Sequence, residues 1–118
     1  MKTNDEKDWK LFRKKLPGWQ EDCMNRLNKE YMEILSQEGK NSSDIFWELD
    51  SRLKRDKNLT GVVARDMRRS NMYGLLIDLL RENTITLDDL SDFSEELQER
   101  LQWLIKPEER WENDGIQM

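Results

Sequence analysis

The sequence predicts an all-α fold, a compact bundle of four to six short helices around a central apolar helix at about residues 72–82. Apolar residues recur at helical spacing along most of the chain. Five glycines and two prolines are too few to separate the many short strands of an all-β fold. The stretch from Met72 to Leu80 is interrupted only by Gly74 and Asp78. As a helix it is apolar nearly all round, so other helices must cover it.

Length and composition predict one domain. The chain has 118 residues, of which 38% are charged, but five tryptophans and three phenylalanines can form a modest core. We expect residues 1–106 to form a single helical domain and residues 107–118 to form a polar, loosely ordered tail. Asp78, inside the apolar stretch, either faces solvent or pairs with an arginine, because a buried carboxylate must be paired or neutral.

Capping residues and helix breakers set the expected helix boundaries. Thr3 to Glu6 has the spacing of a capping box, and Pro17-Gly18 ends the helix that follows. A second helix then covers residues 19–38, with Gly39 as its left-handed C-cap. Thr86 to Asp89 repeats the capping-box spacing, and Ser94 begins a last helix that stops before Pro107.

Two middle segments are also expected to be helical. Ser42 or Ser43 caps the first, which ends at Asn58. Four of its residues are expected to face inward: Ile45, Phe46, Leu49 and Leu53. The second begins after Thr60 and ends near Asn83, and the sequence leaves open whether residues 60–83 form one helix or two.

The residues that usually carry catalysis are missing, which predicts a chain that is not an enzyme and uses no cofactor or metal. Histidine is absent, Cys23 is the only cysteine, and no glycine-rich phosphate loop is present. Asp88, Asp89 and Asp92 are interpreted as helix-start residues, where carboxylates compensate the helix dipole. A single cysteine fits a reducing compartment, and no apolar run approaches 18 residues. We therefore expect a cytoplasmic location and no membrane contact.

A basic stretch at residues 52–69 supports one alternative function, a nucleic-acid-associated module. Two cationic helices joined by a short turn would resemble a helix-turn-helix that contacts phosphates. The candidate phosphate contacts are Arg55, Arg65, Arg68 and Arg69. The net charge of −5 disfavours this hypothesis, so nucleic acid is not the expected partner.

Large apolar residues away from the best core stripes predict a different role. Trp47, Met72 and Trp103 are the candidates, and contiguous exposed groups of this kind mark interfaces. The favoured hypothesis is therefore a non-enzymatic protein-interaction or regulatory module. Its partner is another protein or a second copy of the chain, bound at one face that spans the third and last helices.

Three segments carry a resemblance to a known family. They are Phe46-Trp-Glu-Leu49, Arg69-Ser-Asn-Met72 and Ile85-Thr-Leu-Asp-Asp-Leu-Ser-Asp-Phe93. Together they resemble a family of short bacterial proteins with no established activity, over roughly residues 10–105. The resemblance implies no functional residue.

Overall fold

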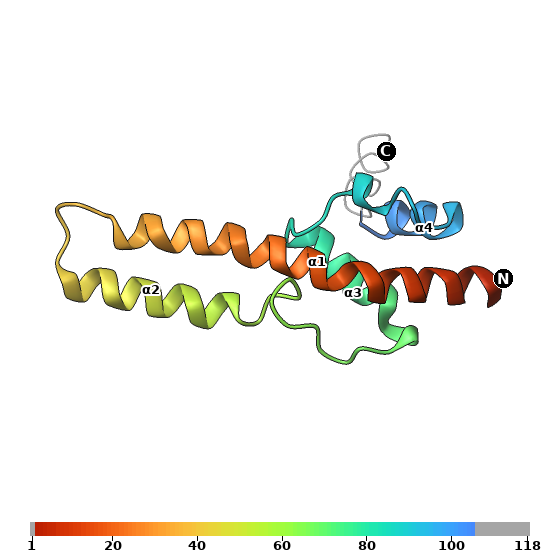
Figure 1. The fold of residues 1–118 in the computed structure, drawn as a ribbon, viewed down its shortest axis with the longest axis horizontal. Coiled ribbons are helices and arrows are strands. Elements are labelled where there is room, and N and C mark those ends of the chain that lie inside the picture. Colours follow the sequence, from red (N-terminus) through yellow and green to blue (C-terminus); the bar gives the residue numbers. More distant parts are fainter. Residues whose placement is uncertain (1, 106–118) are drawn as a thin grey trace, which may run out of the picture.

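The computed structural model describes residues 2–105, which contain four α-helices and two short 3₁₀ helices joined by turns and loops (Figure 1). In chain order they are α1 (Lys2–Leu35), α2 (Ser42–Asp56), η1 (Arg69–Asn71), α3 (Met72–Arg81), η2 (Leu87–Leu90) and α4 (Glu95–Ile105). These residues contain no strand, so the all-α fold is confirmed. The predicted tail and the stop at Pro107 lie outside the described residues.

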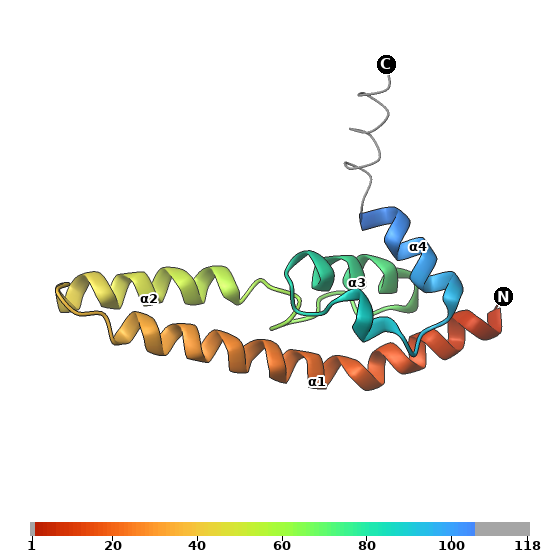
Figure 2. The ribbon, with the colours of Figure 1, turned by 90° about the horizontal axis from the view of Figure 1, so that it is seen from above.

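The longest helix, α1, runs unbroken through Pro17-Gly18, so the predicted break there is wrong. It spans 34 residues and is about 50 Å long at 1.5 Å per residue. Pro17 and Gly18 are both exposed. Figure 2 shows α1 bent, with its concave side toward α3. A proline on the solvent side of a curved helix loses one backbone hydrogen bond but does not interrupt the buried side.

Packing on both sides of Pro17 explains why the helix continues. Phe12 and Leu16 precede it and Cys23 follows it, and all three are buried. Trp19 lies close to two aromatic rings, with its ring centroid 6.3 Å from Phe12 and 6.3 Å from Phe93. A break at residue 17 would separate these side chains, and the burial that they provide outweighs the local preference of proline.

The hydrophobic core lies between the first half of α1 and the helices α3, η2 and α4. Its buried members are Phe12, Leu16, Met72, Leu75, Leu76, Leu79, Ile85, Leu90, Phe93, Leu97 and Leu101. The central apolar helix is thus confirmed as α3. Ile77 and Leu80 are half-buried, while Asp78 is exposed on the remaining side of the helix.

Beyond its contacts with the core and with residues 60–61 and 83–84, the second half of α1 packs against α2 and forms a two-helix arm, which we define as residues 19–35 of α1 together with α2. Figures 1 and 2 both show the arm extending away from α3 and α4. Residues 36–41 connect its helices. Here α1 ends at Leu35, earlier than predicted, and Gly39 takes its left-handed conformation (φ 78°) in the connection rather than as a C-cap.

Residues 57–68 contain no helix, which contradicts the helix predicted from Thr60. After α2 the chain makes turns, and Asp66 adopts a left-handed conformation with φ 56°. The carboxylate of Glu82, directly after α3, holds the first part of this loop. Glu82 accepts hydrogen bonds from the backbone N–H groups of Thr60 and Gly61 at 2.9 and 3.2 Å. Residues 60–83 therefore form a loop followed by η1 and α3.

Two of the predicted helix starts, at Thr86 and at Ser94, are confirmed. Thr86 and Asp89 form a capping box at η2, and Ser94 Oγ accepts the Leu97 N–H at 3.2 Å at the start of α4. Asp8 of α1 secures the same turn, because its carboxylate accepts both the Ser94 N–H and the Ser94 hydroxyl at 3.0 and 2.7 Å. By contrast, Thr3 lies inside α1, and Ser42 is already the first residue of α2.

The joint between arm and core depends on close contact between Gly61 and Cys23. Cys23 is completely buried. A Cβ atom placed on Gly61 would lie 2.5 Å from Cys23 Sγ and 2.6 Å from Thr84 Oγ1. These distances are too short for any other residue at position 61 without movement of its neighbours.

We therefore expect Gly61→Ala to destabilise the protein by about 1–3 kcal/mol, the usual cost of overpacking a filled interior. Gly18→Ala is the matched control, since a Cβ there meets nothing within 4 Å. That change should stabilise α1 by about 0.5–1 kcal/mol, because alanine is the better helix former. Urea unfolding of both variants measures the two opposite effects. Equal stabilities would contradict the close contact.

Candidate functional site

The tip of the arm is held by polar groups from both helices. Gln37 donates one hydrogen bond to the Ile34 carbonyl at 3.0 Å and another to Glu48 at 2.9 Å. Lys40 pairs with the same Glu48 carboxylate at 3.3 Å. These contacts lower the pKa of Glu48, first through the Gln37 hydrogen bond and then through the one from Lys40. The tip is therefore an ordered turn.

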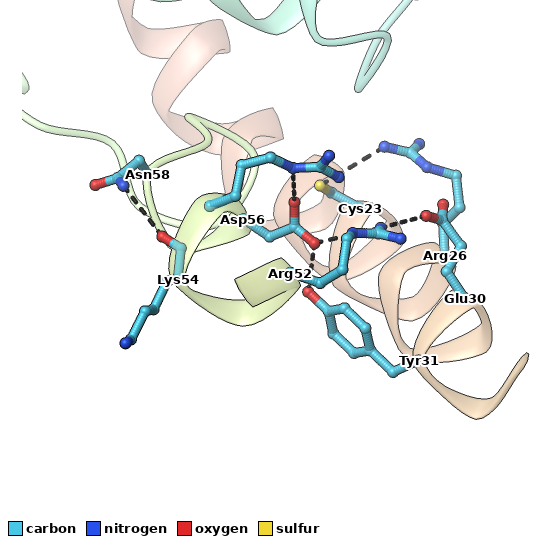
Figure 3. Close-up of polar contacts among 9 residues, drawn as sticks. Cys23, Arg26, Glu30, Tyr31, Arg52, Lys54, Asp56 and Asn58 are labelled. Atoms are coloured by element: carbon cyan, nitrogen blue, oxygen red, sulfur yellow. Dashed lines mark hydrogen bonds and ion pairs between the residues drawn. The ribbon is translucent and has the colours of Figure 1, made fainter. Parts of the chain in front are cut away.

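Nearer the core, the arm is held by a group of charged residues around Asp56 (Figure 3). Asp56 is only 2% exposed and accepts hydrogen bonds from the Tyr31 hydroxyl at 2.7 Å and from Arg55 Nε at 3.1 Å. Arg52 lies 3.4 Å from Asp56 and also pairs with Glu30. The carboxylate of Asp56 is disfavoured both by its burial and by its position as the last residue of α2, where the helix dipole disfavours an anion. The two arginines compensate both effects.

This environment shifts two pKa values. Burial, followed by the hydrogen bond and charge of Asp56, raises the pKa of Tyr31 to about 12. Burial alone would raise the pKa of Asp56, but the hydrogen bonds from Tyr31 and Arg55 and the charge of Arg52 outweigh it and lower that pKa. At neutral pH the pair is therefore a neutral phenol that donates to a carboxylate. This is a structural arrangement.

Beside this group of charged residues, one side of the arm is apolar, and no third helix within residues 2–105 packs closely over it. It is formed by residues spaced three, four or seven apart on the two helices, and we define it as Met24, Tyr31, Leu35, Phe46 and Leu53. Residues so spaced share one side of a helix. Exposure of their side chains is 57% for Leu35, 62% for Phe46 and 37% for Leu53. Three large apolar side chains on this side of the arm are thus exposed.

A groove runs along this side near the core. Its volume is about 180 Å³. The residues that line it are Met24, Leu27, Asn28, Tyr31, Leu53, Asp56, Lys57 and Val62. The apolar side of the arm therefore has a hollow near the core and a protruding aromatic ring, Phe46, toward the tip.

Phe46 extends the exposed surface around α2 through its neighbour Trp47. The two ring centroids are 5.0 Å apart with an interplanar angle of 86°, an edge-to-face pair. Trp47 is 61% exposed, as its position off the core stripe suggested. Phe46 was expected to face inward, and that expectation is wrong, as it is for Leu53. Within residues 2–105, α1 is the one element that packs against α2 through more than isolated contacts, so α2 has one narrow buried side.

The other two candidate interface residues lie elsewhere. Met72 is 2% exposed and belongs to the core, so its predicted place on the surface is wrong. It begins α3 and is covered because every side of that helix but one is packed. Trp103 is 61% exposed on α4. Figures 1 and 2 place α2 and α4 in different parts of the molecule, so they do not form the single predicted face.

Each candidate phosphate-contact arginine already has a side-chain partner within the chain. Arg55 pairs with Asp56, Arg68 pairs with Asp66 at 2.6 Å, and Arg69 lies 3.8 Å from Glu6. Arg65 donates to the side chain of Asn58 at 3.1 Å. The helix-turn-helix of the alternative hypothesis is not formed, since residues 57–68 form a loop.

Other kinds of site find no support in the described residues. Among residues 2–105, no group of His, Cys, Asp and Glu side chains is placed to hold a metal ion. None of the helices in this range has the length and apolar character needed to cross a lipid bilayer. Asp89 has its capping role, and Asp92 pairs with Lys15 at 3.0 Å.

Comparison with known proteins adds no relative: no family model, curated protein or solved structure matches the chain. The resemblance to a family of short bacterial proteins therefore stays a prediction. The apolar side of the arm remains the best candidate for a functional site.

The Tyr31–Asp56 contact can be tested by titration. The chain has two tyrosines, so Tyr73→Phe leaves the Tyr31 phenol as the only one to ionise. Its ultraviolet absorbance change should have a midpoint at about pH 12. Because the folded-state pKa exceeds the ordinary value, the stabilisation is complete below about pH 10 and is lost as the pH rises toward 12. Adding Asp56→Asn should move the midpoint down, and an unchanged midpoint would contradict the assigned contact.

Nucleic-acid binding gives a second test. Because Arg68 and Arg69 already lie beside carboxylates, we expect no association with duplex DNA or RNA at moderate salt, measured by fluorescence anisotropy. If binding did occur with a dissociation constant below about 10⁻⁶ M, the ranking of the two functions would be reversed. In that case Arg68→Ala with Arg69→Ala should reduce the salt slope by about two.

Proposed function

We propose that this chain is a non-enzymatic protein-interaction module whose binding surface is the apolar side of the arm. The observation that carries the proposal is the exposure of Leu35, Phe46 and Leu53 together on an arm two helices thick. Single exposed apolar residues are normal on protein surfaces, but a contiguous set marks an interaction site. Aromatic side chains such as Phe46 and Trp47 are enriched in such sites.

The arm also has the rigidity that a binding surface requires. Polar contacts hold its tip through Glu48 and its base through Asp56, and α1 continues from the arm into the core without a break. A partner would therefore meet side chains that are already in place, which reduces the entropy lost on binding.

A protein partner suits this surface better than a small molecule. The groove holds only about 180 Å³ and its lining does not include the exposed Leu35 and Phe46, whereas small-molecule sites are typically about 300–1,000 Å³ and enclose most of their ligand. The wide, apolar arm instead suits the side of another helix or helical hairpin. We place this role in the cytoplasm, which the free and buried thiol of Cys23 supports.

Site-specific photo-crosslinking in cells that express the chain tests this function. A photoreactive phenylalanine analogue at position 46 should form a covalent adduct with another polypeptide. The matched control places it at Met32, which is 58% exposed but lies on the side of α1 away from α2. An adduct at position 46 and none at position 32 is the expected result. Equal yields, or no adduct at position 46, would contradict the proposal.

A further inference from the structure

We propose that a cleft between α3 and the loop at residues 57–68 binds a small amino acid that carries two carboxylates. This site is separate from the arm, and the inference does not depend on the proposed function. The volume of the cleft is about 510 Å³, which lies within the usual range for small-molecule sites, about 300–1,000 Å³. The loop supplies one wall, and the exposed side of α3 supplies the other.

Unpaired charges of both signs line this cleft. Arg65 comes from the loop and Arg81 from α3, and Asp78 lies three residues before Arg81 on the same helix. Arg65 donates to the neutral side chain of Asn58 at 3.1 Å, and no carboxylate within residues 2–105 forms an ion pair with either arginine. Asp78 likewise has no cation partner in the described part of the chain. The cleft therefore presents two unpaired positive charges and one unpaired negative charge.

These charges select the ligand. A dicarboxylic α-amino acid has two carboxylates and one ammonium group, so its charges are opposite in sign and equal in number to those of the cleft. A guanidinium can hold a carboxylate through two parallel hydrogen bonds, and Asp78 can accept from the ammonium group. The remaining carboxylate of the lining, Asp66, is already paired with Arg68 at 2.6 Å. A simple anion such as phosphate would leave Asp78 unpaired beside another negative charge.

A buried hydroxyl group is a second, independent indication of a polar ligand. Thr60 is only 7% exposed and lines the cleft. Its backbone N–H donates to Glu82 at 2.9 Å and its carbonyl accepts from Gln20 at 3.2 Å, but its hydroxyl has no hydrogen-bond partner within residues 2–105. A buried polar group without a partner is unfavourable. A ligand carboxylate in the cleft would accept a hydrogen bond from this hydroxyl.

The side of α3 that faces the cleft also has room for the carbon chain of the ligand. Gly74, Asp78 and Arg81 are separated by four and three residues, so they share one side of the helix. A Cβ atom on Gly74 would meet only the side chain of Asn71 within 4 Å. Glycine inside a helix is unfavourable, and here it leaves the middle of the cleft open. Ile77, on the same side, supplies apolar surface for methylene groups.

The loop that forms the other wall is already held in place. The side chain of Asn71 donates to the Asp66 carbonyl at 3.1 Å, and Glu82 bonds the beginning of the loop. Asp66 has a left-handed conformation with φ 56°, which is unfavourable outside glycine and is found at ligand-binding sites. Residues 57–68 are also longer than most connections between helices, which have about 2–8 residues. A ligand would therefore bind to a wall that is already formed, which reduces the entropy lost on binding.

An NMR titration of the full chain with L-glutamate at constant ionic strength tests the site. Backbone amide signals of residues 58–66 and 74–81 should shift in a saturable way, and those of residues 36–48 at the tip of the arm should not. We expect a dissociation constant of about 1 mM, because exposed ion pairs each contribute little. Glutarate lacks the ammonium group and L-glutamine lacks the second carboxylate, so each should bind at least about fivefold more weakly.

Three outcomes of this titration would overturn the proposal. One is the absence of saturable shifts at about 20 mM L-glutamate. Another is equal affinity for L-glutamate, glutarate and L-glutamine, which would show that the charges do not select the ligand. The third is tighter binding of inorganic phosphate than of L-glutamate, which would show a site for simple anions.

Single substitutions locate the contacts. Arg81→Gln and Asp78→Asn each remove one charge, and Thr60→Val removes the hydroxyl, so each should weaken L-glutamate binding at least about fivefold. Asp78→Asn should also remove the preference for L-glutamate over glutarate. Lys14→Gln is the matched control, because it removes an exposed positive charge of α1 outside the cleft and should leave the affinity unchanged.

Circular dichroism checks the fold of the variants. Asp78 and Arg81 are exposed, so both variants should keep the fold and give a valid measurement even if Thr60→Val unfolds the chain. Equal loss of affinity in Arg81→Gln and Lys14→Gln would show general attraction between charges rather than a site, and would overturn the proposal. The same holds if Asp78→Asn and Arg81→Gln both bind L-glutamate as tightly as the unchanged chain.

Discussion

Both packing regions of the molecule share α1, and they meet where Pro17 and Gly18 lie in the middle of that helix. A proline inside a helix costs about 3 kcal/mol, and this cost is offset by side chains buried before and after it, such as Phe12 and Cys23. If the helix broke there, the arm could turn relative to the core. Because it continues, the direction of the arm is set by the same hydrophobic packing that stabilises the core.

The arm follows a simple geometric limit. Two helices packed together bury one side each, so any further apolar residues on them stay exposed. Here the buried side holds Leu27 and Ile34, and the contacts of Asp56 replace part of the apolar packing that a third helix would give. The exposed Phe46 and Leu53 are therefore not needed for the contact between α1 and α2. Exposing these apolar side chains to water is unfavourable, and a partner chain that covered them would remove that unfavourable exposure.

Local sequence patterns predicted the features that depend on residues adjacent in the sequence, such as helix caps. The capping box at Thr86, the start of α4 at Ser94 and the apolar character of α3 were all predictable. The continuity of α1 and the direction of Phe46 were not, because both depend on which helices pack nearby. Proline is a strong local signal for a helix break, and at Pro17 it is overridden by packing between residues far apart in the sequence. For the site, off-stripe spacing indicated Trp47, but it also indicated Met72, which the core covers. A seven-residue spacing between Phe46 and Leu53 was the available signal for the exposed side.

The burial of Cys23 makes its thiol a chemical probe of the joint between arm and core. Its side chain is completely covered, with Gly61 on one side and the Thr84 hydroxyl 3.6 Å from the sulfur. A thiol reagent can reach it only when the residues that cover it, such as Gly61 and Thr84, move away from α1. The rate of its modification in the native protein therefore measures how often that joint opens, and it does so without any added label or substitution.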